Sequence, residues 1–197
     1  TSNFPLRGGK ATMYEGGIRV PAIVVWPGIT KPGSRSDEVI QSADFYPTLL
    51  NGLGIELPKN HKIDGVDIAN ALKGGSLDRQ EIFTYFPHSP HVPDWLPPSV
   101  SVHSGDWKLI RLFHGGKQGA HDFRLYNLAD DIGEQNDLAS ANPERVKLLD
   151  AMIEAHLNDA NTLVPLPNPR FDERKYFPKE IGLTRSQWRK LNSNKKR

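Results

Sequence analysis

The chain has 197 residues and a formal net charge of +2, from 25 basic and 23 acidic side chains. So small a net charge creates no global field that would attract nucleic acid. Cysteine is absent, which excludes disulfides and thiolate metal sites within these residues. The longest apolar run, around residues 20–29, contains Pro21 and Pro27 and is too short to span a bilayer. We therefore predict one domain, or one and a half, without a membrane span or a nucleic-acid partner.

The N-terminal stretch contains two glycine pairs, at 8–9 and 16–17, that enclose Lys10, Tyr14 and Glu15. Glycine lets the backbone pass close to a ligand and adopt positive φ without a steric penalty from Cβ. A lysine beside such a turn is a compact cation that can be directed at an anion. The stretch therefore predicts either an anion-binding loop or a glycine-rich surface loop with a solvated lysine.

The segment Val20 to Trp26 follows at once and is apolar on both faces, with several β-branched side chains. Such a run is typical of a strand that is buried on both sides in a parallel sheet. A buried strand needs neighbours, and the rest of the sequence contains no second run of the same kind. We therefore expect the sheet neighbours of this strand to lie outside these residues.

The next segments predict two helices. Phe45, Leu49 and Leu53 recur at helical spacing, with Pro47 in the first turn and Asp44 or Ser42 as the cap. Residues 63–72 predict a turn and a short helix that ends at the glycine pair 74–75.

The second half of the chain has the pattern of a small antiparallel sheet covered by a helix. We predict strands at 81–86 and 123–128 and a hairpin from 100–103 and 107–113, turning at residues 104–106. Asn142 and Pro143 open a helix whose apolar face is Val146, Leu149, Ile153 and Leu157. Residues 164–197 are rich in proline and basic side chains, which predicts a solvated tail or a patch for an anionic substrate.

Four segments together resemble the formylglycine-dependent sulfatases of the alkaline phosphatase superfamily. They read PLRGGKATMYEGGIRVPAIVVWPG, SADFYPTLLNGLG, GDWKLI and RLYNLADDIGEQNDLA. The resemblance implies an α/β fold with three parts. Residues 1–76 would be the end of an alkaline-phosphatase-like sulfatase domain. Residues 77–163 would be a C-terminal α+β subdomain with a small antiparallel sheet and a packed helix, and residues 164–197 a proline-rich and basic tail.

The same resemblance implies a sulfuric ester hydrolase that cleaves a sulfate ester of a sugar or aryl compound. Lys10 matches the family lysine that contacts sulfate, while Tyr14, Glu15 and Arg19 match positions that we interpret as scaffolding of the loop. The formylglycine nucleophile and the ligands of the calcium ion are expected outside this chain, in an N-terminal part of the catalytic domain. The 197 residues alone are therefore expected to be inactive, and no residue is assigned as a metal ligand.

The segment 87–95 is a second candidate site, since the family has a similar segment near its substrate cleft. His88 and His91 could donate hydrogen bonds to sugar hydroxyls, and Trp95 could stack on a ring; a proline-rich loop with incidental histidines is the alternative. A zinc site on the two histidines is weakly supported, because the sequence offers no further ligand nearby.

Two other functions stay open. One is hydrolysis of a phosphomonoester or phosphonate, which uses similar parts. The other is a non-catalytic module that binds sulfated polysaccharide through Lys10, the histidine segment and the basic tail. Members of the family often act in the periplasm or outside the cell, so the resemblance also implies export.

Overall fold

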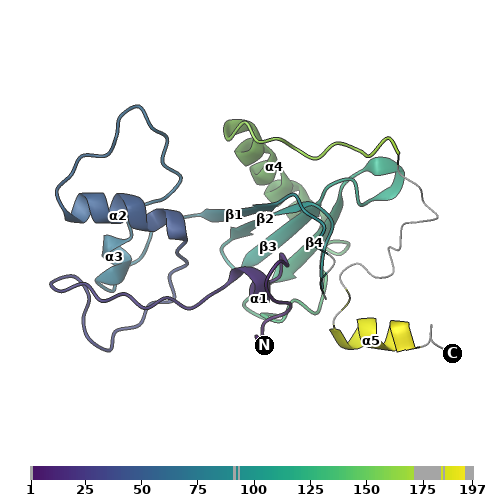
Figure 1. Cartoon of the computed structure of the whole chain (residues 1–197), viewed down its shortest axis with the longest axis horizontal. Helices are drawn as coiled ribbons and strands as arrows, with labels where there is room; N and C mark the ends of the chain where they lie inside the picture. The colour runs from purple at the N-terminus through teal and green to yellow at the C-terminus, as the bar shows by residue number, and fades with distance from the viewer. Residues whose placement is uncertain (1, 91, 93, 171–182, 184, 194–197) are drawn as a thin grey trace. The chain divides into compact units, whose positions relative to one another are not determined.

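The computed structural model describes residues 2–90, 92, 94–170, 183 and 185–193, and the chain divides into two compact units (Figure 1). The first unit joins Thr1–Val20 to Gln80–Arg197, and the second is Pro21–Arg79. Among the described helices, none combines the length and the apolar character that a membrane crossing requires. The expected division into residues 1–76, 77–163 and 164–197 stays a prediction.

A four-stranded antiparallel sheet forms the centre of the first unit, with the strands in the order β1-β2-β3-β4. The strands are β1 (Glu81–Phe86), β2 (Ser99–Ser104), β3 (Trp107–Leu112) and β4 (Asp122–Asn127). Gly105 turns the β2–β3 hairpin with φ of 55°, and the turn η2 (Lys117–Gly119) lies between β3 and β4. All the predicted strands of this region, and the predicted hairpin, are confirmed.

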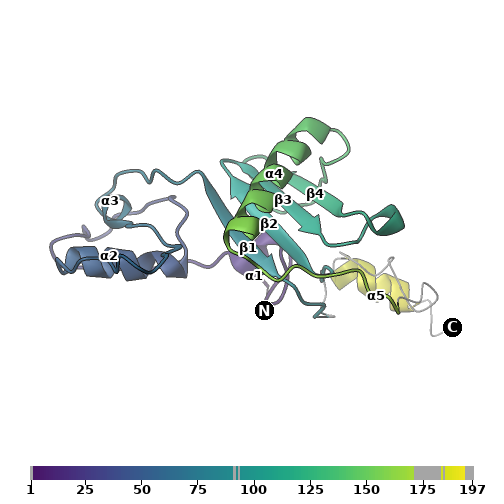
Figure 2. The ribbon, with the colours of Figure 1, turned by 90° about the horizontal axis from the view of Figure 1, so that it is seen from above.

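Helix α4 (Pro143–Asp159) covers one face of this sheet (Figure 2). Leu149, Ile153 and Leu157 are buried against the sheet, as their spacing predicts. Asn142 stands at the N-cap, but its side chain donates to the carbonyl of Leu138 (3.0 Å) and makes no capping hydrogen bond. The tail contains helix α5 (Arg185–Ser193), and the last basic residues, 195–197, lie outside the described residues.

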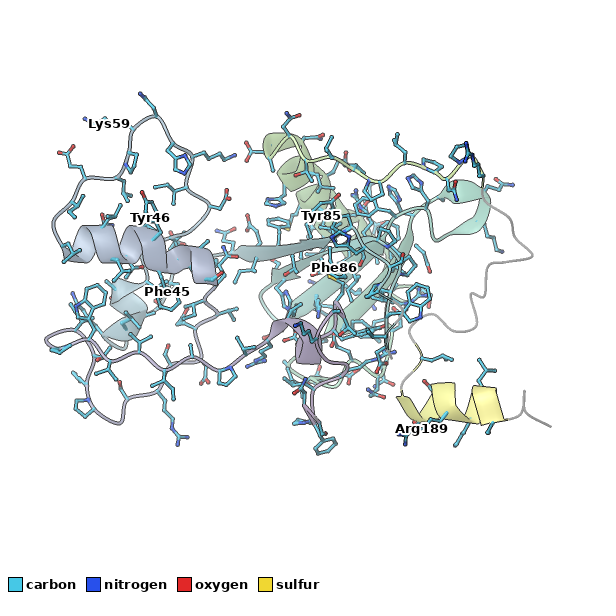
Figure 3. All side chains as sticks on the ribbon, viewed as in Figure 1. Phe45, Tyr46, Lys59, Tyr85, Phe86 and Arg189 are labelled. Carbon is cyan, nitrogen blue, oxygen red and sulfur yellow. The ribbon has the colours of Figure 1, made fainter. Side chains whose placement is uncertain are left out.

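The N-terminal stretch and its short helix α1 (Glu15–Ile18) cover the opposite face of the sheet. Side chains alternate along a strand, so neighbours face opposite layers. On β3, Leu109 lies in the cluster with α4, whereas Ile110 lies with Met13 and Tyr14 of the N-terminal stretch. Tyr85 and Phe86 of β1, labelled in Figure 3, likewise pack against opposite clusters. The sheet therefore holds the N-terminal stretch on a fixed surface.

The second unit contains η1 (Ser42–Asp44), α2 (Phe45–Gly52) and α3 (Ala69–Leu72), which confirms both predicted helices. The apolar face predicted for α2 is not buried, because Leu49 and Leu53 are 49% and 69% exposed. Pro47 and Thr48 are the buried side chains of this helix.

The role expected for Asp44 needs a correction. Asp44 stands at the N-cap of α2, but its carboxylate makes no capping bond to that helix. It accepts hydrogen bonds from the backbone N–H groups of Gln41 (2.7 Å) and Val66 (3.0 Å) and forms an ion pair with Arg79. A fully buried carboxylate requires such partners, so Asp44 connects three segments of the unit.

The strand expected from Val20 to Trp26, with its sheet neighbours outside these residues, is not formed in this structure. The segment has no regular secondary structure, and Ile23 and Val25 are 93% and 84% exposed. A strand forms only when a neighbour satisfies its backbone groups. Within the described residues, the four-stranded sheet is built from other segments, and Val20 to Trp26 pairs with none of its strands.

Candidate functional site

Lys10 lies at the tip of a tight turn that begins at Gly9 and ends at Thr12. The N–H of Thr12 donates to the carbonyl of Gly9 (3.1 Å), and the Thr12 hydroxyl donates to the same oxygen (2.8 Å). Ala11, the third residue of the turn, has φ of 71°. Thr12 is buried while Lys10 is exposed, so the turn presents the lysine to solvent from a fixed base.

The second glycine pair brings α1 into direct contact with this turn. A Cβ atom at Gly17 would lie 2.2 Å from the carbonyl oxygen of Thr12, and one at Gly16 would lie 2.4 Å from that of Arg7. The N–H of Gly16 donates to the Arg7 carbonyl (2.7 Å), and the Asn3 side chain donates to the Gly16 carbonyl (2.7 Å). The close approach requires glycine at both positions.

Three buried charges lie at the start of α1, the short helix that follows the turn. The ammonium of Lys108, on β3, contacts Oε1 of Glu15 (2.9 Å) and Oε1 of Glu134 (2.8 Å), and all three side chains are at most 4% exposed. His103, on β2, contacts the same oxygen of Glu15 through Nε2 (2.8 Å). Glu134 also accepts the backbone N–H of Glu15 through Oε2 (2.6 Å). We name this set the Lys108 cluster: Glu15, His103, Lys108 and Glu134.

The two carboxylates of the cluster have opposite pKa shifts. Burial by itself would raise the pKa of Glu15, but the hydrogen bond from His103 and the charge of Lys108 outweigh it and lower the pKa to about 2. For Glu134, burial prevails over Lys108 and the pKa is raised. Lys108 and His103 thus favour the ionised form of Glu15.

Arg7 connects the turn to the histidine segment. Its guanidinium lies over the ring of Tyr14 (3.9 Å to the centroid) and donates to the carbonyl of Glu134 (2.8 Å). Its Nε contacts Asp94 Oδ1 at 3.2 Å. Asp94 is 7% exposed and precedes Trp95 directly. The ion pair therefore holds the base of the Lys10 turn and the segment 87–95 together.

The structure places the predicted substrate-binding residues on this segment with different exposures. His88 is exposed, and its ring meets that of Phe86 edge-on with centroids 5.0 Å apart. Trp95 is half-buried. His91 lies outside the described residues. The interpretation of Tyr14 and Glu15 as scaffolding agrees with their burial.

The described residues contain no group of three or more histidine, aspartate or glutamate side chains that could hold a metal ion. The zinc hypothesis for the histidine segment has no support from the part of the chain that the structure describes. Calcium does not fit there either, since it takes 6–8 oxygen ligands in proteins.

Sequence reasoning missed Lys108, Glu134 and Asp94. Lys108 carried a signal: it shares the inward face of β3 with Ile110 and Leu112, and a charge on such a face requires a partner. Glu134 and Asp94 lie in irregular segments, where no periodicity marks burial.

Comparisons with known proteins match most of the chain. The family model described as "N-sulphoglucosamine sulphohydrolase, C-terminal" matches residues 9–162. A sulfatase of Formosa agariphila is 36% identical over 154 residues, which is 75% of this chain and 28% of the relative. Human arylsulfatase A is 34% identical over 183 residues, covering 81% of this chain and 35% of the relative. The chain thus spans about a third of the length of these relatives.

A solved structure also resembles the chain. It is a protein of a Bacteroides thetaiotaomicron genetic locus for the metabolism of multiple glycosaminoglycans, with a TM-score of 0.60 and 27% identity. The match covers 76% of this chain and 31% of that protein. The expected fold class, an α/β protein whose C-terminal subdomain has a small antiparallel sheet and a packed helix, is confirmed.

Proposed function

We propose that this chain, which belongs to the sulfatase family, forms one wall of a sulfate-ester hydrolase active site and supplies Lys10 to the sulfate group. The observation that carries the proposal is the contrast between an exposed ammonium and the buried, hydrogen-bonded base that presents it. A solvated surface lysine needs no such support, whereas a cation that must meet an anion at one place does.

Hydrolysis of a sulfate monoester breaks the S–O bond to the leaving oxygen, which takes up a proton from water. The oxygen of that water becomes bonded to sulfur, and the group departs as sulfate. Negative charge moves onto the leaving oxygen as this bond breaks. The Lys10 ammonium, placed beside that oxygen and the sulfuryl oxygens, stabilises the charge. It can also donate the hydrogen bond that the leaving oxygen needs.

The nucleophile and the metal belong to another part of the proposed enzyme. We place the formylglycine and the calcium ligands in residues outside this chain, as the sulfatase resemblance implies. The purified 197 residues should then give no turnover of an aryl sulfate with added calcium. Turnover by the isolated chain would contradict this division.

The substrate class that we propose is a sulfated sugar or an aryl sulfate. The relatives' names support both, because one is an arylsulfatase and one belongs to a glycosaminoglycan locus. The segment 87–95 would contact the part of the substrate beyond the sulfate: His88 and His91 through hydrogen bonds, and Trp95 by stacking. Arg7 and Asp94 hold this segment to the Lys10 turn.

The test is Lys10→Ala in the complete enzyme, assayed with an aryl sulfate. We expect kcat/KM to fall by at least about a hundredfold, the scale of losing one charge-stabilising group. Lys117→Ala is the matched control, because Lys117 is also an exposed lysine of the first unit. An unchanged rate for Lys10→Ala would remove Lys10 from the site. Equal turnover of an aryl phosphate would favour the phosphate-ester alternative.

A further inference from the structure

Lys108 is a fully buried ammonium near the start of β3 that contacts carboxylates from two distant segments. Glu15 lies 93 positions before it in the sequence, and Glu134 lies in the irregular segment after β4. Burying an ion pair gives little net stability, because the loss of hydration offsets the attraction. The cluster therefore calls for an explanation beyond the stability of the fold.

The Lys108 cluster contacts the chain on both sides of the Lys10 turn. On the C-terminal side, Glu134 Oε2 accepts the N–H of Glu15, where α1 begins. On the N-terminal side, the Glu134 carbonyl accepts from the guanidinium of Arg7. Arg7 and α1 are also joined directly, by the bond from the Gly16 N–H to the Arg7 carbonyl. The turn has little freedom to shift while Glu15 and Glu134 stay in place.

Lys108 keeps these two carboxylates together. Without its charge, Glu15 and Glu134 would face each other as buried like charges, and one of them would protonate or move apart. Either response alters the segments that carry Arg7 and the start of α1. The position of Lys10 thus depends on a side chain 98 positions later in the sequence.

We propose that Lys108 is a positioning residue of the sulfate site and acts on the reaction through Lys10, by way of Glu15 and Glu134. This inference rests on the proposed role of Lys10. It assigns Lys108 no contact with substrate. A displacement of about 1 Å in a reacting group can cost about a hundredfold in rate, so a modest shift of the turn is enough to be measured.

The experiment is a double-mutant cycle in the complete enzyme with an aryl sulfate, using Lys10→Ala, Lys108→Met and the double variant. We expect Lys108→Met to lower kcat/KM by at least about tenfold. In the Lys10→Ala background the same substitution should cost less than about twofold, because the group that it positions is already gone. A general loss of folded enzyme would lower the rate in both backgrounds.

Arg111→Met is the matched control. Arg111 is another buried cation of β3, but it faces α4, where it pairs with Asp150 and Glu154. Its loss should leave kcat/KM per folded enzyme within about twofold, because it packs on the other face of the sheet and shares no partner with the Lys108 cluster. If Lys108→Met does not fold, Glu134→Gln provides the same cycle, because it removes the charge and keeps an oxygen for the Glu15 N–H.

Each outcome decides between the two proposals. A full loss for Lys10→Ala together with an unaffected Lys108→Met enzyme overturns the positioning role alone. The same holds if the losses multiply in the double variant. A Lys10→Ala enzyme that keeps its full rate overturns the proposed function and, with it, the role of Lys108.

Discussion

The Lys108 cluster makes a quantitative prediction about acid stability through Glu15. Its pKa is lowered from 4.5 to about 2, and its side chain is only 4% exposed. A shift of this size corresponds to about 3 kcal/mol in favour of the folded state when the carboxylate is ionised. Because the folded-state pKa is the lower one, this stability is present above pH 4.5 and is lost as the pH falls toward 2.

The perturbation is Glu15→Gln, which removes the charge and keeps the shape of the side chain. At pH 5.0 the variant should be less stable than the native chain by about 3 kcal/mol, and at pH 3.5 the difference should shrink by about 1 kcal/mol. Glu134 and Lys108 also lie beside the Glu15 carboxylate, and Arg19 contacts its second oxygen, Oε2.

Urea unfolding followed by circular dichroism measures both free energies in the 197-residue chain. Glu81→Gln is the matched control, because Glu81 is an exposed glutamate on β1. It should change the free energy of unfolding by less than about 0.5 kcal/mol at either pH. A difference between native chain and Glu15→Gln that is the same at pH 5.0 and 3.5 would refute the reasoning, since it would mean that Glu15 has no lowered pKa.

Two further predictions concern the backbone and the second unit. Gly17→Ala should destabilise the chain by at least about 1 kcal/mol in urea unfolding, because its Cβ would lie 2.2 Å from the Thr12 carbonyl oxygen. Gly9→Ala should be milder, since the nearest atom to its Cβ is 3.7 Å away, and equal effects would contradict the contact. Asp44→Ala should cost about 3–5 kcal/mol, because it leaves Arg79 without its buried partner. A transition in the second unit that is unchanged by Asp44→Ala would show that the pair does not hold it together.

Local patterns along the sequence were enough to predict the sheet and its helix. The alternation in 81–86, the glycine of the 104–106 turn and the spacing of Leu149, Ile153 and Leu157 each act over a few residues. Such signals survive without knowledge of the rest of the fold, because a strand or a helix face is defined by its own repeat. The glycine pairs around Lys10 likewise predicted a loop there from the sequence alone.

The partners of the buried charges were decided only by the tertiary structure. Asp44 reads as a helix cap, yet it binds Arg79, 35 positions away. Lys108 meets Glu15 only because the N-terminal stretch folds onto the inward face of β3. The segment Val20 to Trp26 has the composition of a buried strand but is largely exposed, because a strand takes its hydrogen bonds from a neighbour and the described residues provide none. Composition and hydrophobic periodicity determine which secondary structure a segment can form. Long-range contacts decide whether that structure forms and which partner each buried charge has.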